Sequence, residues 1–297
     1  MKTCIIFNPV ARGEKARLFK ERIAGFAGQC CLKPTTGPGA ARVLAAEALR
    51  EGFETIVAAG GDGTVNEVLN GIGAVQDGVA RMKLGILPLG TVNVFAKEIG
   101  LPMDVLQAWN IVLAGRTRLI DLAAADFATG SGQPGRRYFV QMAGAGMDAR
   151  AIELVNWEQK KAIGPLAYVW AGFKAMRGPL PQIVVTVGTE TCSGELVLVG
   201  NGRYYGGRFV LFPQADLADG ILEVTIFPRV DWAGLARCGW NILTGQSPAA
   251  GRAVRLRGKS IQLASSSPAP FHVEGENTGH LPVTFSVRPA ALRVMVP

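Results

Sequence analysis

A run of small and polar residues near position 60 has the composition of a phosphate-binding loop. The run reads Gly60-Gly61-Asp62-Gly63-Thr64; it follows an apolar segment, Thr55–Ala59, and opens a helical segment that contains Glu67. Glycines let backbone N–H groups approach a phosphate closely, and a helix N-terminus attracts anions. Thr64 and Glu67 have the spacing of a capping box, and the Asp62 carboxylate suits Mg²⁺ beside the phosphates. A plain strand-to-helix turn is the alternative interpretation.

Two further loops follow apolar runs in the same way. Pro88-Leu89-Gly90-Thr91-Val92-Asn93 comes after Lys83–Leu87, and Asn8-Pro9 comes after Thr3–Phe7. Adjacent parallel strands bring the loops at their carboxyl ends to one edge of the sheet. We therefore expect the three loops to form the walls of one nucleotide crevice, although each of these two runs alone also fits an ordinary turn.

Other phosphate motifs fit the sequence less well. Gly258-Lys259-Ser260 resembles the end of a Walker A loop, but Ala253 stands where the leading glycine should be. No GxGxxG run follows the first strand, which disfavours a Rossmann dehydrogenase. The two histidines, His272 and His280, have no metal-ligand companion at useful spacing, so we interpret both as structural or incidental.

The elements that must position these loops form an α/β pattern over residues 1–122. Short, continuously apolar strands alternate with helical stretches such as Ala40–Arg50. Such strands are typical of a parallel sheet that is buried on both faces. The sequence therefore predicts a nucleotide-binding α/β domain at 1–122, to which the last segment, 288–297, can return.

Beyond Asp121 the hydrophobic pattern alternates with a period of two residues, as in Ile183–Val187, Leu222–Ile226 and Val283–Val287. This pattern predicts half-buried strands, and several of them favour a mostly antiparallel β-sandwich at 123–287. We expect helices near 150–178 and 231–245, and a hairpin loop at 129–136.

Composition limits the class of protein and its partners. The 297 residues are 48% hydrophobic and 18% charged, which is typical of a compact globular protein. No apolar run approaches the ~20 residues that cross a membrane, so we expect a cytoplasmic location. The five cysteines lack metal-site spacing and are expected to be reduced core residues. The net charge of +8 favours an anionic partner, either a nucleotide or a membrane surface rather than nucleic acid, and the chain is compatible with a homodimer.

The three loops resemble the nucleotide-binding motifs of the diacylglycerol kinase catalytic family, which includes bacterial lipid kinases and sphingosine and ceramide kinases. NAD kinases and bacterial phosphofructokinases are similar at the Gly60–Thr64 loop alone, but the family resemblance covers nearly the whole chain. It continues through five runs: Arg118-Leu119-Ile120-Asp121, Gly164-Pro165-Leu166-Ala167-Tyr168, Tyr205-Gly206-Gly207, Ala215-Asp216-Leu217-Ala218-Asp219-Gly220 and Val273-Glu274-Gly275-Glu276.

The resemblance implies an ATP- and Mg²⁺-dependent kinase of a membrane-lipid hydroxyl, on diacylglycerol-like lipids, sphingoid bases or ceramide. It implies that ATP is held by Asn8, Pro9, Arg12, Gly60, Gly61, Asp62, Gly63, Thr64, Glu67, Gly90, Thr91 and Asn93. It implies that Asp62 and Asp121 lie at the metal that accompanies ATP, that Asp216 and Asp219 bind a structural cation, and that Glu274, Asp62 and Glu276 take part in catalysis. ATP would lie on the first domain while the second brings Glu274, as general base, to the acceptor hydroxyl.

The chain departs from the family pattern at three places. Glu274 stands where the family has aspartate, Val94 where it often has aspartate, and Ala11-Arg12 where it has Ser-Gly. The basic residue near the phosphates is therefore open between Arg12 and Lys15. Asp219 fits a simple Asp-Gly turn equally well, and Glu274 and Glu276 also fit exposed positions that flank a turn.

A lipid substrate requires contact with a bilayer, and two sets of residues mix the needed chemistry. We expect peripheral binding to anionic membranes through residues of these sets, although a packed helix and a solvated strand face are the simpler interpretations. The sets are Trp157, Lys160, Lys161, Trp170, Phe173, Lys174 and Arg177, and Arg252, Arg255, Arg257 and Lys259. Two alternative functions remain: a kinase of a soluble acceptor such as NAD, and a catalytically weakened nucleotide-binding regulatory protein.

Overall fold

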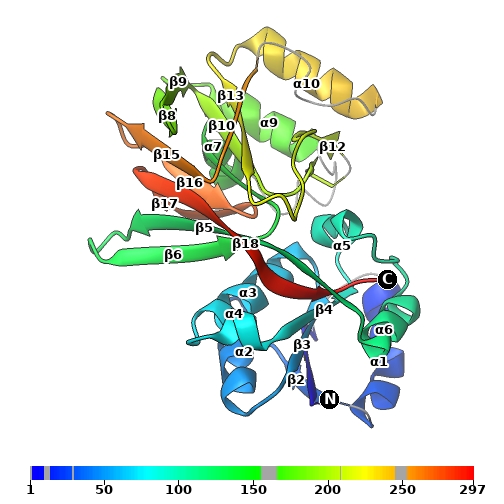
Figure 1. Cartoon of the computed structure of the whole chain (residues 1–297). Helices are drawn as coiled ribbons and strands as arrows, with labels where there is room; N and C mark the ends of the chain where they lie inside the picture. Colours follow the sequence, from blue (N-terminus) through cyan, green and yellow to red (C-terminus); the bar gives the residue numbers. More distant parts are fainter. Residues whose placement is uncertain (1, 10–13, 29, 155–165, 208, 245–252) are drawn as a thin grey trace. The chain divides into compact units, whose positions relative to one another are not determined.

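The computed structural model describes residues 2–9, 14–28, 30–154, 166–207, 209–244 and 253–297 (Figure 1). The chain divides into two compact units. Unit 1 consists of Met1–Leu122 and Arg288–Pro297, and unit 2 consists of Ala123–Val287. Two long strands, β5 (Thr117–Ala128) and β18 (Val283–Met295), contribute residues to both.

Unit 1 contains a parallel sheet in the order β2-β1-β3-β4. Its strands are β1 (Thr3–Phe7), β2 (Cys31–Pro34), β3 (Thr55–Gly60) and β4 (Lys83–Pro88). The carboxyl-terminal part of β18 adds to β4, also in parallel. In register, Phe7 lies beside Ala59 and Ala59 beside Leu87, so the three central strands end at the same level.

Helices cover both faces of this sheet, which is why its strands are continuously apolar. α1 (Glu14–Ala27) and α6 (Val105–Ala114) share an apolar core with β1 and β3, in which Trp109 packs. α2 (Ala40–Arg50) and α3 (Asp62–Gly73) pack against each other and on β1 and β3 (Figure 1). The short helices α4 (Gly78–Arg81) and α5 (Val94–Glu98) complete the unit.

Unit 2 is a sandwich of two sheets with antiparallel strand pairs. In one sheet β18 pairs with β15, β15 with β8 and β8 with β9, and β5 pairs with β18 and with β6; the other sheet has the order β14-β13-β10-β7-β16-β17. The first-sheet strands are β6 (Pro134–Phe139), β8 (Ile183–Val187), β9 (Glu190–Gly194) and β15 (Ser260–Ser265). The second-sheet strands are β7 (Met142–Gly146), β10 (Leu196–Gly200), β13 (Leu222–Phe227), β14 (Val254–Gly258), β16 (Pro270–Val273) and β17 (Glu276–His280).

The core of the sandwich is held by aromatic rings from facing strands. Phe271 of β16 lies edge-on to Phe285 of β18 with 6.3 Å between ring centroids, and Phe139 lies 5.9 Å from Phe285. All three side chains are buried, and burying each contributes about 1.5–3 kcal/mol to folding. In the described part of unit 2, the sheets are accompanied by the helices α7 (Met147–Leu154), α9 (Leu166–Ala175) and α10 (Trp232–Thr244) and by the short strand pair β11 (Tyr204–Tyr205) and β12 (Phe209–Val210).

The prediction of a parallel α/β domain followed by an antiparallel sandwich is confirmed. β1, α2 and β8 have the bounds that the apolar runs predict. The helical region predicted near 150–178 consists of α7 and α9, with residues 155–165 outside the described part of the chain.

Candidate functional site

Three loops leave the same edge of the unit 1 sheet, because β1, β3 and β4 end at one level. The loops after β3 and β4 are joined directly, since the Leu89 N–H donates to the Gly60 carbonyl over 3.0 Å. The Asn8 and Pro9 side chains, after β1, are half-buried. The shared edge that the sequence predicts is therefore a consequence of strand register.

Glycines at this edge leave no room for side chains. A Cβ placed on Gly90 would stand 2.5 Å from the Gly61 Cα and 2.7 Å from the Asn93 Oδ1. A Cβ on Gly60 would stand 2.3 Å from the Thr64 Oγ1. The two loops therefore meet through the backbones of Gly61 and Gly90, with the Thr64 and Asn93 side chains packed beside the glycines.

Side chains from both loops fix this contact. The Asp62 carboxylate accepts a hydrogen bond from the Phe95 N–H at 3.1 Å, which ties the start of α3 to α5. The Asn93 amide donates to the Gly90 carbonyl at 2.6 Å and holds its own turn, where φ is 52°. The buried Asn93 Oδ1 has no hydrogen-bond partner among the described residues.

The predicted capping box is wrong. α3 begins after Gly61, which has extended backbone and no side-chain cap. The Glu67 carboxylate accepts instead from the Gly39 N–H at 2.9 Å and the Ala41 N–H at 3.0 Å, at the start of α2. The first N–H groups of α3 therefore lack a side-chain cap of their own, as an anion-binding helix start requires. Both carboxylate oxygens of Glu67 accept hydrogen bonds from the start of α2, so these bonds do not support the predicted contact of Glu67 with ATP.

Other residues predicted to bind ATP or metal lie in unit 1. Thr91 is exposed beside Asn93. Asp121 is 1% exposed in β5, and its Oδ1 accepts from the Ala290 N–H at 2.8 Å. Arg12 lies outside the described residues, and the side chain of Lys15 is likewise not described.

The aspartates predicted to bind metal are Asp62 and Asp121 in unit 1 and Asp216 and Asp219 in unit 2. Within the described ranges, no group of three or more histidine, cysteine, aspartate or glutamate side chains could hold a metal ion. Asp216 accepts from the Ala218 N–H and Asp219 from the Ile221 N–H, each at 2.9 Å, which is the pattern of an Asx turn. Asp219 also pairs with Arg257, so a cation at this loop would compete with a guanidinium.

In unit 2 the predicted general base is held by backbone amides. The Glu274 Oε1 accepts from the Val140 N–H and the Gln141 N–H, each at 2.8 Å, and the Glu274 N–H donates to the Met142 carbonyl at 2.9 Å. Glu274 has φ 52°, a left-handed conformation that is uncommon outside glycine and asparagine. The carboxylate is half-buried, so the interpretation as an exposed turn residue is wrong for Glu274, whereas Glu276 is exposed.

Buried ionisable groups elsewhere in unit 2 were not evident from the sequence. His272, interpreted as structural or incidental, is fully buried and lies 2.8 Å from Asp148, while His280 is exposed. Glu223 is 1% exposed, and desolvation raises its pKa even though the Gln214 N–H donates to it at 2.9 Å. His272 and Asp148 are far apart in the sequence, so no local pattern points to their contact.

Burial makes two of the cysteines, Cys4 and Cys238, poor nucleophiles. All five are free, but only Cys4 is fully buried, which corrects the expectation of five core residues. Burial raises the pKa of Cys4 to about 12 and that of Cys238 to about 11. Both remain neutral thiols at physiological pH, which are poor nucleophiles and poor metal ligands.

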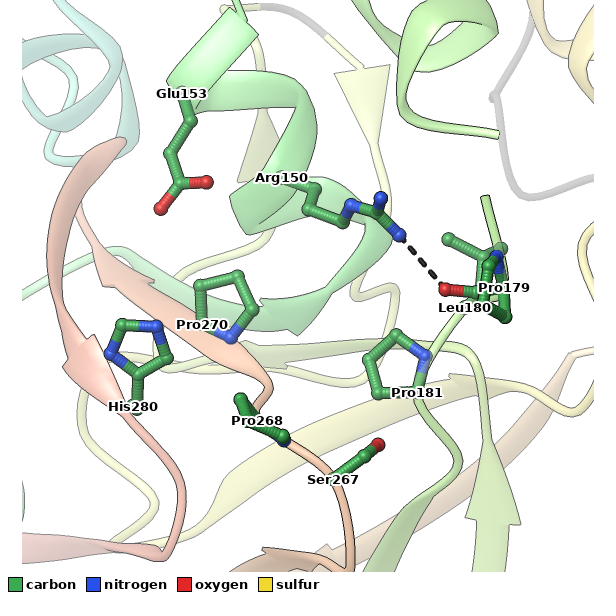
Figure 2. A pocket seen from close by; sticks show the side chains of 9 residues that line it. All are labelled: Arg150, Glu153, Pro179, Leu180, Pro181, Ser267, Pro268, Pro270 and His280. Atoms are coloured by element: carbon green, nitrogen blue, oxygen red, sulfur yellow. Dashed lines mark hydrogen bonds between the residues drawn. The ribbon is translucent and has the colours of Figure 1, made fainter. Parts of the chain in front are cut away.

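Unit 2 also has an open pocket of about 470 Å³ that contains none of the predicted site residues. Figure 2 shows Arg150 and Glu153 of α7 above a wall of prolines, with Arg150 donating to the Pro179 carbonyl at 3.0 Å. The other lining residues are Leu180, Pro181, Ser267, Pro268, Pro270 and His280. No activated nucleophile lies among them.

Of the residues expected to meet a membrane, some pack against other side chains, some form ion pairs, and some lie outside the described part of the chain. Phe173 stacks on Trp232 with centroids 5.5 Å apart, and Arg177 is exposed. Arg255 lies 3.6 Å from the Glu223 carboxylate and Arg257 pairs with Asp219, so these two are not a freely solvated stripe. Outside the described residues lie Trp157, Lys160, Lys161 and Arg252.

No helix among the described residues has the length and apolar character to cross a bilayer.

Two family models match the chain, one over each half. The model of the diacylglycerol kinase catalytic domain matches residues 2–125, and that of the YegS C-terminal NAD kinase beta sandwich-like domain matches residues 141–296. Together they cover the strand-end loops of unit 1 and the Glu274 turn of unit 2.

Curated relatives and solved structures are similar over nearly the full length. A diacylglycerol kinase of Staphylococcus saprophyticus is 31% identical over 294 residues, 95% of this chain and 90% of that protein. One from Staphylococcus haemolyticus is 30% identical over 300 residues, 96% of this chain and 86% of that protein. The crystal structure of a diacylglycerol kinase from Bacillus anthracis has a TM-score of 0.76 at 22% identity, covering 100% and 97% of the two chains. Yeast NADH kinase shares the fold with a TM-score of 0.57 at 11% identity, covering 100% and 84%.

Proposed function

The chain belongs to the diacylglycerol kinase family, and from that premise we propose that it transfers the γ-phosphoryl group of ATP to the hydroxyl of a diacylglycerol-like membrane lipid. A lipid kinase transfers phosphate to an alcohol, so the products are ADP and a lipid phosphate monoester. The relatives named diacylglycerol kinase support diacylglycerol over a sphingoid base or ceramide as the acceptor.

The observation that carries the nucleotide half of the proposal is the contact between Gly61 and Gly90. Glycines let main-chain N–H groups approach a phosphate closely, and these two also let the loops meet through their backbones, since a Cβ on Gly90 would lie 2.5 Å from the Gly61 Cα. The uncapped N–H groups of α3 would hold the phosphates.

Mg²⁺ would neutralise charge that develops on the phosphates as transfer proceeds. Magnesium is commonly held by one or two carboxylates together with substrate phosphates and waters, so it needs no cage of protein ligands. Asp62 suits this role because it lies in the first turn of α3, although one of its oxygens already accepts from the Phe95 N–H. Asp121, whose Oδ1 is bound to the Ala290 N–H, remains a second candidate.

Glu274 is proposed to take the proton from the acceptor hydroxyl as its oxygen attacks the γ-phosphorus. A carboxylate held by the amides of Val140 and Gln141 has a fixed position, and positioning is most of what a phosphoryl-transfer enzyme contributes. General-base assistance contributes about 10²–10⁴ in rate. Glu274→Ala should therefore lower kcat by about that factor while the affinity for ATP stays unchanged.

We further propose that α10 meets the bilayer. Trp232 and Trp240 are 53% and 66% exposed, and helical geometry puts them on one side of α10, about 12 Å apart along its axis. Tryptophan is enriched where an apolar surface meets lipid headgroups, and the exposed Arg237 on the same helix suits an anionic membrane.

The test is incubation with Mg²⁺ and ATP carrying labelled γ-phosphate, with diacylglycerol, sphingosine, ceramide and NAD as separate acceptors. Label should enter the organic phase with diacylglycerol and should fall by at least 10²-fold with Glu274→Ala. Label on NAD in the aqueous phase would indicate a soluble acceptor instead. Binding of nucleotide without any transfer would indicate a regulatory protein.

A further inference from the structure

Three hydrogen-bonded side chains, one fully buried and two half-buried, lie next to the Glu274 turn in unit 2. His272 of β16 lies with its Nε2 2.8 Å from the Asp148 Oδ2, and the Tyr205 hydroxyl donates to the other oxygen, Oδ1, also over 2.8 Å. The His272 side chain is 1% exposed and that of Asp148 is 11% exposed. We call these three residues the Asp148 network.

The second ring nitrogen of His272 connects the network to the turn. The Gly275 N–H donates to the His272 Nδ1 over 3.3 Å. An Nδ1 that accepts carries no proton, so the hydrogen of the neutral imidazole lies on Nε2 and is donated to Asp148. The carboxylate thereby selects the one tautomer that can receive the Gly275 N–H.

The turn needs such support because of its backbone. Glu274 and Gly275 have φ of 52° and 78°, the left-handed pair of a two-residue hairpin turn between Val273 and Glu276, which are register partners. Glycine adopts this conformation freely, whereas glutamate does so at a cost. The bond from Gly275 to His272 fixes the residue that immediately follows Glu274.

The space for the ring is made by a glycine on the neighbouring strand. Gly144 of β7 is the register partner of His272. A Cβ at Gly144 would stand 2.5 Å from the His272 Nε2 and 3.2 Å from the Asp148 Oδ2. The contact between His272 and Asp148 therefore requires glycine at position 144 of β7, because any larger residue there would crowd both side chains.

We propose that Asp148, His272 and Tyr205 are positioning residues for the Glu274 carboxylate, acting through the Gly275 N–H. The proposal rests on the proposed role of Glu274 as general base. None of the three needs to touch substrate. Their effect is to keep the turn in the conformation that presents the carboxylate, with the amides of Val140 and Gln141 as its other support.

The first comparison is between two substitutions of His272. His272→Ala removes both bonds of the ring, whereas His272→Asn can keep an acceptor at the position of Nδ1; both lose the donor to Asp148. We expect kcat to fall about 10–100-fold in His272→Ala and to recover at least threefold in His272→Asn, with the KM for ATP unchanged in both. His280→Ala, an exposed histidine on β17, is the matched control and should retain full kcat.

The second comparison separates positioning from general stability. Tyr205→Phe removes one hydroxyl at the far end of the network and should lower kcat about 3–10-fold with the melting temperature nearly unchanged. In a Glu274→Ala background, where residual turnover is followed with labelled ATP, the same Tyr205→Phe change should have no further effect on kcat, because residues that act through one group are non-additive.

The outcomes distinguish the two proposals. An equal loss of kcat from Tyr205→Phe in both backgrounds, or no loss in the natural background, would overturn the positioning role. Equal activity of His272→Ala and His272→Asn, both well below the natural protein, would do the same. Normal turnover by Glu274→Ala would instead remove the general base, and with it the proposed function of that residue.

Discussion

Gly90→Ala is the most direct test of the contact between the two glycine loops. The added Cβ would lie 2.5 Å from the Gly61 Cα, about 1 Å short of ordinary van der Waals contact, and the obstructing atom is main chain that cannot rotate away. The loops must therefore separate, at a cost of about 1–3 kcal/mol for an overpacked site.

The cost should appear in nucleotide binding as well as in folding. If about 2 kcal/mol is lost from the phosphate-binding arrangement, the Kd for ATP rises about 30-fold. A displacement of about 1 Å at the phosphates would also lower kcat by as much as about 10²-fold. The assay is calorimetric titration with ATP, with circular dichroism and thermal unfolding measured on the same samples.

A graded series of glycine substitutions provides the controls. At Gly61 an added Cβ would lie 3.4 Å from the Gly90 Cα, at the edge of ordinary contact, and at Gly37 it would meet nothing within 4 Å. The affinity for ATP should therefore fall in the order Gly37→Ala, Gly61→Ala, Gly90→Ala, with Gly37→Ala equal to the natural protein. An ATP affinity of Gly90→Ala within twofold of the natural protein, in a folded sample, would refute the reasoning.

Three other substitutions have defined outcomes. Glu67→Ala should lower the free energy of unfolding by about 1.5–3 kcal/mol in urea titrations, because two backbone amides at the start of α2 lose a charged acceptor. Glu47 is exposed on α2, so Glu47→Ala should lower the free energy of unfolding by less than about 0.5 kcal/mol. Equal effects of the two substitutions would contradict the capping of α2 by Glu67. Burial raises the pKa of Glu223 in the folded chain, so the folded state binds this proton more tightly, and stability from this residue is lost as pH rises above about 4.5 toward the raised value. Thermal unfolding measured from pH 4 to pH 8 should therefore show the stability of Glu223→Gln rising relative to that of the natural protein, and a difference that is constant with pH would refute the reasoning. Trp240→Ala should weaken sedimentation with anionic vesicles about tenfold, while Val43→Ala, which trims an exposed valine on α2, should leave it unchanged; unaltered binding of Trp240→Ala would exclude α10 as the membrane contact.

Local sequence predicted those parts of the molecule that depend on neighbouring residues. β1 and α2 follow their apolar patterns residue for residue, because a strand buried on both faces and a helix with one apolar side have distinct periods. The glycine runs at 60–63 and 90 were evident for a similar reason, since glycine at a strand end has few purposes other than a turn or a close approach.

The sequence did not predict what each polar side chain contacts. Glu67 has the spacing to cap its own helix, but the structure directs it to α2, because α2 and α3 pack side by side and α2 begins with an uncapped Gly39. Asp219 fits an Asp-Gly turn and also pairs with Arg257, which is distant in the sequence and brought near by the pairing of β13 with β14.

The amino-acid sequence by itself determined the fold class and the family, and it predicted which residues could do chemistry. The tertiary structure decided which of these residues act together. His272 and Asp148 are 124 positions apart, and only the pairing of β16 with β7 and the start of α7 after β7 bring their side chains to 2.8 Å. Hydrophobic periods are repeated along the chain and can be read locally, whereas a single hydrogen bond depends on the final position of two strands to within a fraction of an ångström.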